Sequence, residues 1–323
     1  MKNENTLSKN QFPSKVLLFG EYSTLLDSWG LAIPYQSYSG ELKFYDSKGS
    51  VKGSRDGSEQ LEQLVVKSNH NLLLFKDYLG KNIKQLPLLF DLQSFERDLK
   101  NNIYFSSSIP QGYGIGSSGA LVAAVFDRYG NGNENNLVEL RNIFIQFENY
   151  FHGTSSGIDP LISFLKVPIL IKSKDECGPV TLPEAALANK NGPVFFLINT
   201  NRAKKTGMYV SMFMDKCKGD KSFDRLMRED YIPWNNQAIT TFLEEKWQNF
   251  YINFYNISKF QFENFSPMIL PEYQQLWKSG LDSGEFNLKL CGSGGGGLIL
   301  GTTKKLQMLE RVRSCSEVIL VWN

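Results

Sequence analysis

The sequence predicts an α+β fold, because segments patterned as strands and segments patterned as helices follow one another without a regular alternation. Residues 15–19 form an apolar run typical of a buried strand, whereas residues 135–150 repeat apolar side chains every three or four positions, as a helix does. Further apolar runs at 194–198, 288–290 and 298–300 predict strands near the end of the chain. A doubly wound parallel sheet would instead show strand and helix in strict succession.

The other elements are predicted in chain order from the same two periodicities. Residues 38–45 alternate between apolar and polar side chains, which indicates a half-exposed strand. The remaining predictions are a helix at 92–99, a strand at 102–106, a helix passing into a strand over 161–171, helices between 206 and 265, and a closing helix before a strand at 318–321. Residues 173–191 contain acids, Gly and Pro with little periodicity, so we expect domains over 1–175 and 176–323.

Composition is ordinary for a globular protein. Of the 323 residues, 41% are hydrophobic and 21% charged, and the net charge of +2 comes from basic residues scattered among acids. This pattern favours neither a nucleic acid nor a membrane surface as partner. The N-terminus has no apolar signal core, so a cytoplasmic location is predicted. Four widely separated cysteines do not suggest a disulfide scaffold or a zinc site, and two histidines exclude a histidine-rich metal site.

The first chemical motif is a glycine-rich segment that opens directly onto an apolar helical run at 121–126. A helix N-terminus has unpaired N–H groups and favours negative charge, so a glycine-rich turn before it can cradle a phosphate. Its residues are Pro110, Gly112, Gly114, Gly116, Ser117, Ser118 and Gly119. The two serines can cap the helix, bind phosphate or ligate a metal ion. No Lys follows the glycines, which excludes the Walker P-loop, and an ordinary loop before a capped helix is the alternative.

Two further sites carry glycine beside apolar runs. Residues 291–297 contain five glycines in seven positions, which indicates either a flexible hairpin or main chain that approaches a ligand or another loop closely. Near the N-terminus, Lys15 begins a buried strand that ends at Gly20 and Glu21. An ammonium group removed from water needs a partner, although a surface lysine at a strand edge is the alternative.

Two acids, Glu148 and Asp159, flank a loop that contains His152. The loop can turn the chain so that both carboxylates face one cavity. Magnesium takes one or two carboxylates with phosphate oxygens and water, and a hydroxyl nucleophile needs a carboxylate to orient or accept its proton. One acid for each task matches phosphoryl transfer. The alternatives are a solvated helix acid for Glu148, a helix N-cap for Asp159 and a structural role for His152.

The three glycine-bearing sites and the acidic pair, in this order, resemble the GHMP kinases, the superfamily of galactokinase, homoserine kinase, mevalonate kinase and phosphomevalonate kinase. The first motif, Pro-x-Lys-x-x-Leu-x-Gly-Glu, is similar to residues 13–21. The second, Pro-x-x-x-Gly-Leu-Gly-Ser-Ser-Ala, resembles residues 110–119, with Gly119 in place of the usual Ala. The third, Lys-Leu-Thr-Gly-Ala-Gly-Gly-Gly-Gly, resembles residues 289–297.

The resemblance implies a role for each site residue. Asp159 orients or deprotonates the acceptor hydroxyl, and Lys15 stabilises the developing negative charge. Mg²⁺ is held between the β- and γ-phosphates of ATP by Ser118 and Glu148. Contacts with ATP are implied for Pro110, Gly112, Gly114, Gly116, Ser117, Ser118, Gly119, Gly294 and Gly295. Contacts with the substrate are implied for Glu21, Tyr22, His152 and Thr206.

The resemblance also implies a two-lobed fold, with an N-terminal ribosomal-protein-S5-like domain and a C-terminal ferredoxin-like domain. The run from Glu148 through His152 to Asp159 is most similar to the mevalonate kinases, which implies transfer of the γ-phosphate of ATP to the 5-hydroxyl of mevalonate. Mevalonate kinases commonly carry His where Tyr22 stands, so phosphomevalonate or a sugar is an alternative acceptor. A sensor without catalysis would have lost Lys15, Glu148 or Asp159. Relatives include homodimers.

Overall fold

The computed structural model describes residues 7–45, 55–83, 90–131, 136–173, 175–187, 192–203 and 206–322. The chain forms two compact units, and each is discontinuous in sequence. Unit 1 consists of Met1–Lys15, Pro34–Ile109 and Gly116–Lys166, and unit 2 of Val16–Ile33, Pro110–Ile115 and Val167–Asn323. Two long strands, β1 (Phe12–Phe19) and β2 (Gly30–Phe44), supply residues to each unit. The predicted division between residues 175 and 176 stays a prediction.

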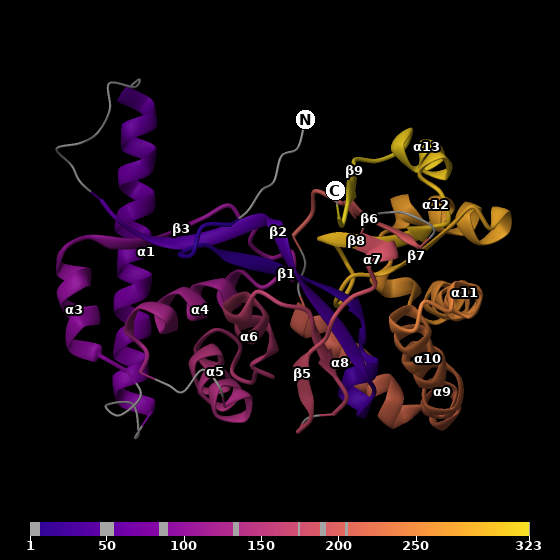
Figure 1. The fold of residues 1–323 in the computed structure, drawn as a ribbon, viewed down its shortest axis with the longest axis horizontal. Helices are drawn as coiled ribbons and strands as arrows, with labels where there is room; N and C mark the ends of the chain where they lie inside the picture. The colour runs from indigo at the N-terminus through magenta and orange to yellow at the C-terminus, as the bar shows by residue number, and fades with distance from the viewer. Residues whose placement is uncertain are drawn as a thin grey trace. The chain divides into compact units, whose positions relative to one another are not determined.

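Unit 1 combines an antiparallel strand pair with helices (Figure 1). Strand β3 (Ile103–Ser107) pairs with β2, from Gly40 opposite Ser107 to Phe44 opposite Ile103. The helices are α1 (Arg55–Asn82), α3 (Leu92–Lys100), α4 (Ser117–Tyr129), α5 (Leu137–His152) and α6 (Ile158–Leu165). The predicted helices at 92–99 and 135–150 and the strand at 102–106 are confirmed.

Helix α1 is attached to its neighbours by buried apolar side chains and by a side-chain amide. Val65, Leu72, Phe75 and Leu79 are buried and lie on one helix face. The amide of Asn69 donates hydrogen bonds to the Leu99 and Ile103 carbonyl oxygens, at 3.0 and 2.8 Å. One side chain of α1 therefore binds both the end of α3 and the start of β3.

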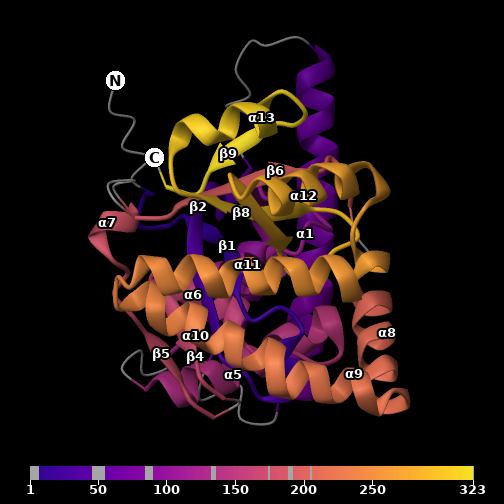
Figure 2. The same ribbon diagram turned by 90° about the vertical axis from the view of Figure 1, so that its right-hand side faces the viewer.

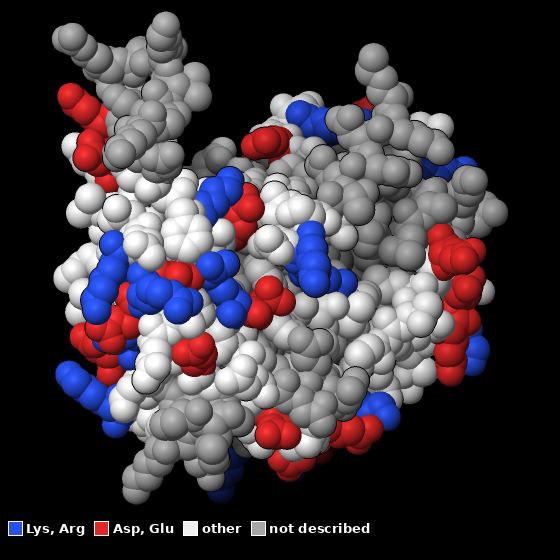
Figure 3. Space-filling model, turned by 60° about the vertical axis from the view of Figure 1, so that its left-hand side comes forward, with Lys and Arg blue, Asp and Glu red and all other residues white. Residues whose placement is uncertain are grey.

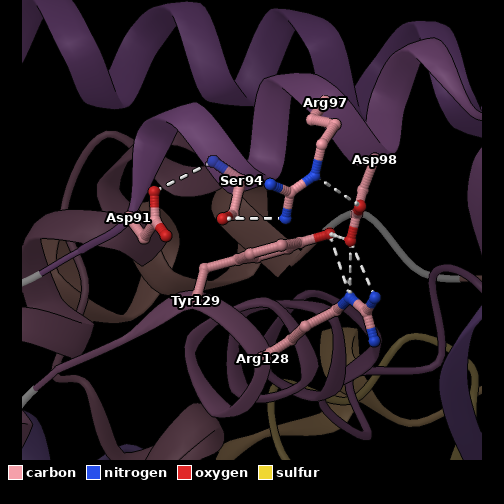
Figure 4. A network of polar contacts seen from close by, with 6 residues as sticks. All are labelled: Asp91, Ser94, Arg97, Asp98, Arg128 and Tyr129. Atoms are coloured by element: carbon pink, nitrogen blue, oxygen red, sulfur yellow. Dashed lines mark hydrogen bonds and ion pairs between the residues drawn. The ribbon is translucent and has the colours of Figure 1, made fainter.

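Asp98 links α3 to α4 through a network of charged and polar side chains (Figure 4). The Arg128 guanidinium donates two hydrogen bonds to Asp98 Oδ2, at 2.7 and 3.0 Å. The buried hydroxyl of Tyr129 donates to the same oxygen at 3.0 Å, and the Tyr129 ring stacks on Phe95. A buried carboxylate is stable when its lone pairs are used in this way.

Unit 2 contains two groups of strands. Strands β4 (Ile169–Ile171) and β5 (Cys177–Pro179) extend β2 at its first residues, and all of these pairs are antiparallel. The second sheet has the order β7-β8-β6-β9 and is also antiparallel. Its strands are β6 (Val194–Asn199), β7 (Phe286–Leu290), β8 (Leu298–Thr303) and β9 (Val318–Leu320). The predicted strands at the end of the chain are therefore confirmed.

Helices make up most of the rest of unit 2. They are α7 (Glu184–Leu187), α8 (Thr206–Gly219), α9 (Lys221–Leu226), α10 (Ile232–Leu243), α11 (Trp247–Asn264), α12 (Pro271–Ser283) and α13 (Glu310–Arg313). A π-helical turn, Met227–Tyr231, joins α9 to α10, and 3-10 turns occupy Ser23–Leu26, Ser266–Met268 and Leu306–Leu309. Figure 2 shows α10 and α11 side by side. The indole of Trp277 donates to Ser258 Oγ at 3.0 Å and ties α12 to α11.

The surface carries charges of both signs. On the face drawn in Figure 3, Lys and Arg side chains lie next to Asp and Glu side chains. Within the described ranges, no helix is both long enough and apolar enough to span a bilayer. The cytoplasmic location, the homodimer and the absence of a nucleic-acid partner stay predictions.

Asp98→Ala should lower the free energy of unfolding by about 2 kcal/mol, because the buried Tyr129 hydroxyl and Arg128 lose their acceptor. Urea unfolding measures this loss. Arg97→Ala is the matched control, since Arg97 is exposed and lies 3.9 Å from Asp98. Its effect should stay below about 0.5 kcal/mol. Equal effects of the two substitutions would show that the network does not stabilise unit 1.

Candidate active site

Lys15 and Asp159 form an ion pair in unit 1. Lys15 lies in β1, and Asp159 is the second residue of α6, where a negative charge is favoured by the helix dipole. The distance between Lys15 Nζ and Asp159 Oδ1 is 3.0 Å, and the side chains are 12% and 28% exposed. Lys15 is therefore not a surface lysine at a strand edge. The N-cap of α6 is Gly157, so the alternative of Asp159 as a helix cap is wrong as well.

Beside this pair, Glu148 in α5 accepts hydrogen bonds from one side chain in α4 and one in the loop after α5. Ser118 Oγ donates to Glu148 Oε1 at 3.4 Å, and Ser155 Oγ donates to the other carboxylate oxygen. His152 Nε2 lies 2.9 Å from Ser118 Oγ. Glu148 is 3% exposed, so it is not a solvated helix acid. The Ser118 hydroxyl faces this carboxylate and makes no capping hydrogen bond at the start of α4.

The buried position of Glu148 changes its acidity. Burial, and after it the negative charge of Asp159, raise the pKa of the Glu148 carboxyl to about 7. The hydrogen bond from Ser155 and the positive charge of Lys15 act in the opposite direction. A cation bound beside the carboxylate would favour its ionised form.

The donor atoms at this place fit Mg²⁺. A carboxylate and a hydroxyl are hard oxygen ligands, and the remaining ligands of Mg²⁺ are commonly phosphate oxygens and water. Among the described residues, no group of three or more His, Cys, Asp or Glu side chains could hold a metal ion. A magnesium ion at Ser118 and Glu148 would take its remaining ligands from phosphate and water, and this site stays a prediction.

Two glycines let α4 approach the ion pair closely. Gly116 has a φ of 81°, and a Cβ there would lie 3.0 Å from Lys15 Cγ. A Cβ on Gly119 would lie 2.7 Å from the carbonyl carbon of Asp159 and 2.8 Å from the nitrogen of Pro160. Gly119 departs from the GHMP kinase pattern, and the structure places it against the main chain of Asp159 and Pro160. The missing methyl group at 119 makes room for the main chain that carries Asp159.

The other half of the predicted phosphate loop belongs to unit 2. Pro110, Gly112 and Gly114 precede the boundary at residue 116, and the two glycines have φ values of 77° and 70°. The carbonyl oxygen of Tyr113 would lie 2.6 Å from a Cβ on Gly297. The ATP contacts predicted for this loop, including Ser117 at the start of α4, stay predictions.

Glu21 and Tyr22 lie in the interior of unit 2. The Glu21 carboxylate accepts a hydrogen bond from Lys289 Nζ, and both side chains are fully buried. Tyr22 is 5% exposed, and its hydroxyl donates to the carbonyl oxygen of Ser293 at 2.5 Å. These contacts join the end of the first motif to the third motif. Substrate contacts of Glu21 and Tyr22 stay predictions.

The glycine-rich segment 292–297 is held by neighbouring main chain. The Gly295 N–H donates to the Met268 carbonyl oxygen at 2.6 Å, and the Gly297 N–H donates to the Arg202 carbonyl oxygen at 2.7 Å. A Cβ on Gly295 would lie 2.0 Å from the Tyr209 ring. The segment connects the antiparallel strands β7 and β8 as a hairpin loop, and its main chain also approaches other parts of the chain closely.

Sequence reasoning missed several residues that contact the predicted site. Ser155 and Tyr209 are examples, and Ser155 had a readable indication in its place between the two acids. Lys289 stood in the third motif, but no contact was assigned to it. Thr206 begins α8, but its side chain lies outside the described residues. Its predicted contact with substrate stays a prediction, as does that of His152.

Gly119→Ala should destabilise unit 1 by about 1–3 kcal/mol, because the new methyl group meets the main chain at Asp159 and Pro160. Helix propensity alone would predict the opposite sign. Gly80→Ala in α1 is the control, since its Cβ would lie 3.7 Å from Leu92 Cδ1, an ordinary contact. It should stabilise by about 0.5–1 kcal/mol. Urea unfolding of both variants decides, and a stabilising Gly119→Ala contradicts the close approach.

The metal-free protein should lose stability as the pH rises from 5 to 8. The pKa of Glu148 is about 7 in the folded protein and about 4.5, its ordinary value, in the unfolded chain. Folding therefore favours the protonated carboxyl. This contribution is complete below pH 4.5 and is lost as the pH rises through 7. Urea unfolding of the wild type and of Glu148→Gln at several pH values isolates the effect. A difference between the two that does not change with pH would contradict the raised pKa.

The sequence matches one family model and several individual proteins. Residues 77–166 match the sequence model described as "GHMP kinases N terminal domain". This range contains Ser118, Glu148 and Asp159. The mevalonate kinase of Thermococcus onnurineus (strain NA1) is 27% identical over 159 residues, 47% of each chain. That of Pyrococcus furiosus is 26% identical over 196 residues, 52% of this chain and 57% of the relative. The chain thus matches about half the length of these curated relatives.

Solved structures resemble the whole chain in fold. The L. major mevalonate kinase in complex with R-mevalonate has a TM-score of 0.60 at 16% identity, covering 98% of this chain and 95% of that one. The Streptococcus pneumoniae phosphomevalonate kinase in complex with phosphomevalonate and AMPPNP has a TM-score of 0.57 at 14% identity, covering 96% and 98%. The predicted α+β fold class is therefore confirmed. The chain has the fold of the GHMP kinases, and its sequence resembles the mevalonate kinases within that superfamily.

Proposed function

We propose that the chain is an ATP-dependent small-molecule kinase that transfers the γ-phosphate to the 5-hydroxyl of mevalonate. The observation that carries this proposal is the Lys15–Asp159 ion pair beside the hydrogen bond from Ser118 to the buried Glu148 in unit 1. Phosphoryl transfer needs a carboxylate for the nucleophile, a cation for the developing charge and oxygen ligands for a metal ion. The four side chains supply these groups within one unit.

In the proposed reaction, Asp159 accepts a hydrogen bond from the acceptor hydroxyl and takes its proton. The hydroxyl oxygen forms a bond to the γ-phosphorus of ATP, and the bond to the bridging oxygen breaks, so that ADP leaves. Lys15 holds the Asp159 carboxylate in place at 3.0 Å and places positive charge beside the reacting groups. Most of the acceleration then comes from positioning and from electrostatic stabilisation.

Ser118 and Glu148 would hold Mg²⁺ with the phosphates of ATP. The ion supplies neutralisation of phosphate charge when it is bound. Ser155 fixes one Glu148 oxygen by its hydrogen bond, which leaves Oε1 directed at Ser118. His152 contacts the same Ser118 hydroxyl and orients it. Both side chains therefore support the two ligands.

A second acceptor is favoured by one residue of this chain. Tyr22 occupies the position where mevalonate kinases commonly carry His, and its hydroxyl is bonded to the main chain at Ser293. Phosphomevalonate or a sugar is therefore the alternative acceptor. Relatives of the fold include the phosphomevalonate kinase above and a Lactococcus lactis galactokinase complexed with galactose. A sensor without catalysis is less favoured, since Lys15, Glu148 and Asp159 are all present.

ADP release by the purified protein tests both parts of the proposal. With Mg-ATP we expect turnover of mevalonate, and little with phosphomevalonate, homoserine or galactose. Asp159→Asn should lower this turnover by at least about 100-fold, because the proton acceptor is lost, while ATP still binds. Turnover of another acceptor alone would replace mevalonate. Near-native turnover by Asp159→Asn would contradict the assigned mechanism.

A further inference from the structure

A short loop in unit 1 joins the helices that carry Glu148 and Asp159. Helix α5 contains Glu148 and ends at His152, and α6 begins at Ile158 with Asp159 as its second residue. The glycines at 153 and 157 have φ values of 73° and 70°, so the chain turns sharply at both ends of the loop. The contacts of this loop should therefore show how one acid is placed relative to the other.

The start of α6 packs closely on one face of α5. Arg141, Ile145 and Glu148 are spaced by four and three positions, which places them on the same helix face. A Cβ on Gly157 would lie 2.8 Å from the Arg141 carbonyl oxygen and 2.9 Å from Ile145 Cγ1. The Arg141 guanidinium also donates to the Ser156 carbonyl oxygen at 2.9 Å. Two residues of this face thus hold the end of the loop, and Glu148 is the third residue on it.

Ser155 connects Glu148 to α6 through both functions of its hydroxyl group. The hydroxyl donates its hydrogen to Glu148 Oε2. Its oxygen accepts a hydrogen bond from the Gly157 N–H at 3.0 Å, and Gly157 is the N-cap of α6. The N–H groups at the start of a helix have no partner within it, so Ser155 satisfies one of them. Ser155 is therefore bonded both to the Glu148 carboxylate and to the helix that carries Asp159.

The two hydrogen bonds of Ser155 depend on each other. A hydroxyl has one hydrogen, and its lone pairs accept from other directions. When the hydrogen is donated to Glu148, the lone pairs are available to the Gly157 N–H. Consecutive hydrogen bonds of this kind polarise and strengthen one another. A change at Glu148 is thereby transmitted to the start of α6, two residues before Asp159.

Asp159 is held from other elements as well. Lys15 Nζ of β1 lies 3.0 Å from Asp159 Oδ1. A Cβ on Gly119 of α4 would lie 2.7 Å from the carbonyl carbon of Asp159, so the main chain at Asp159 is in close contact with α4. These contacts fix Asp159 from the side of β1 and α4, and Ser155 fixes the same turn of α6 from the side of α5.

We propose that Ser155 is a positioning residue, which couples the Glu148 carboxylate to the start of α6 and thereby sets the position of Asp159. The roles of Glu148 toward Mg²⁺ and of Asp159 toward the acceptor hydroxyl rest on the proposed function. Under that function one hydroxyl places both the metal ligand and the proton acceptor, so the two groups come into position together.

Amide hydrogen exchange in the nucleotide-free protein tests the connection. Ser155→Ala should make exchange over residues 157–161 about tenfold faster, because the Gly157 N–H loses its acceptor. Ser155→Thr keeps a hydroxyl and should restore the wild-type rate. Equal exchange in Ser155→Ala and the wild type would overturn the proposal.

Ser68→Ala is the matched control in unit 1. Ser68 of α1 is half-buried like Ser155, and its hydroxyl also accepts from one main-chain N–H and donates to one oxygen. Both partners belong to Phe105, at 2.8 and 3.3 Å. Ser68→Ala should leave exchange over 157–161 unchanged. Faster exchange there in this variant as well would show general loosening of unit 1 and would overturn the specific role of Ser155.

A double substitution tests the coupling from its other end. Glu148→Ala should also speed exchange over 157–161, by about threefold, because Ser155 loses the acceptor that directs its hydroxyl. In the Ser155→Ala background, Glu148→Ala should have no further effect, since the connecting hydroxyl is gone. Additive effects would give the two residues independent roles and would contradict the coupling.

Kinetics give a readout that depends on the proposed function. Ser155→Ala should lower kcat about tenfold and raise the half-saturating Mg²⁺ concentration several-fold, and Ser155→Thr should recover both. A lower kcat with an unchanged Mg²⁺ requirement would separate the two acids and overturn the coupling. If the wild type turns over no acceptor, the proposed function fails. The exchange measurements then still decide whether Ser155 couples Glu148 to α6.

Discussion

Contact between main-chain segments, made possible by missing Cβ atoms, is the constraint on which both groups of predicted site residues depend. In unit 1, Gly119 lets α4 meet the main chain at Asp159, and Gly116 leaves room for Lys15. In unit 2, a Cβ on Gly294 would lie 2.5 Å from the Met268 carbonyl oxygen, which is too close for any side chain at this position. At each of these positions the glycine allows two parts of the chain to come close together. The cost is entropic, because glycine loses more conformational freedom on folding than other residues do.

The second theme is the handling of buried charge. Glu21 and Lys289 satisfy each other in the interior of unit 2, where a lone charge would be strongly destabilising. Glu148 accepts hydrogen bonds from the hydroxyls of Ser118 and Ser155, and burial, followed by the negative charge of Asp159, raises its pKa to about 7. The first arrangement is complete in itself and fits a structural role. The second favours a positive ligand, which is the expected property of a metal site.

Sequence predicted the fold class, and it singled out four side chains that lie together in unit 1, because both leave local patterns. Their role as a site stays a prediction. Helix α5 follows its apolar spacing, and the motif around Ser118 marks the start of α4. No element was predicted over α1, although its buried residues recur at seven-residue steps, as in Val65, Leu72 and Leu79. Strand β2 begins at Gly30, earlier than the predicted 38, because Leu31 to Ile33 are buried on both faces and show no alternation.

Contacts between distant segments could not be predicted. Nothing in the local sequence of Tyr22 indicates that its hydroxyl bonds to Ser293, or that Pro160 meets Gly119. These pairs depend on how helices and strands pack, which is a property of the whole unit. The interleaving of the two units has the same origin, since β1 and β2 run through both.

This interleaving has a consequence for synthesis on the ribosome. Glu21 is among the first residues to emerge, but its counter-ion Lys289 follows 268 residues later. Unit 2 cannot bury that carboxylate with its partner until β7 has been synthesised. Its N-terminal segments therefore stay partly solvated while the residues of unit 1 are synthesised. Folding of unit 2 is therefore expected to be late and dependent on the C-terminal strands, whatever the order in which its helices form.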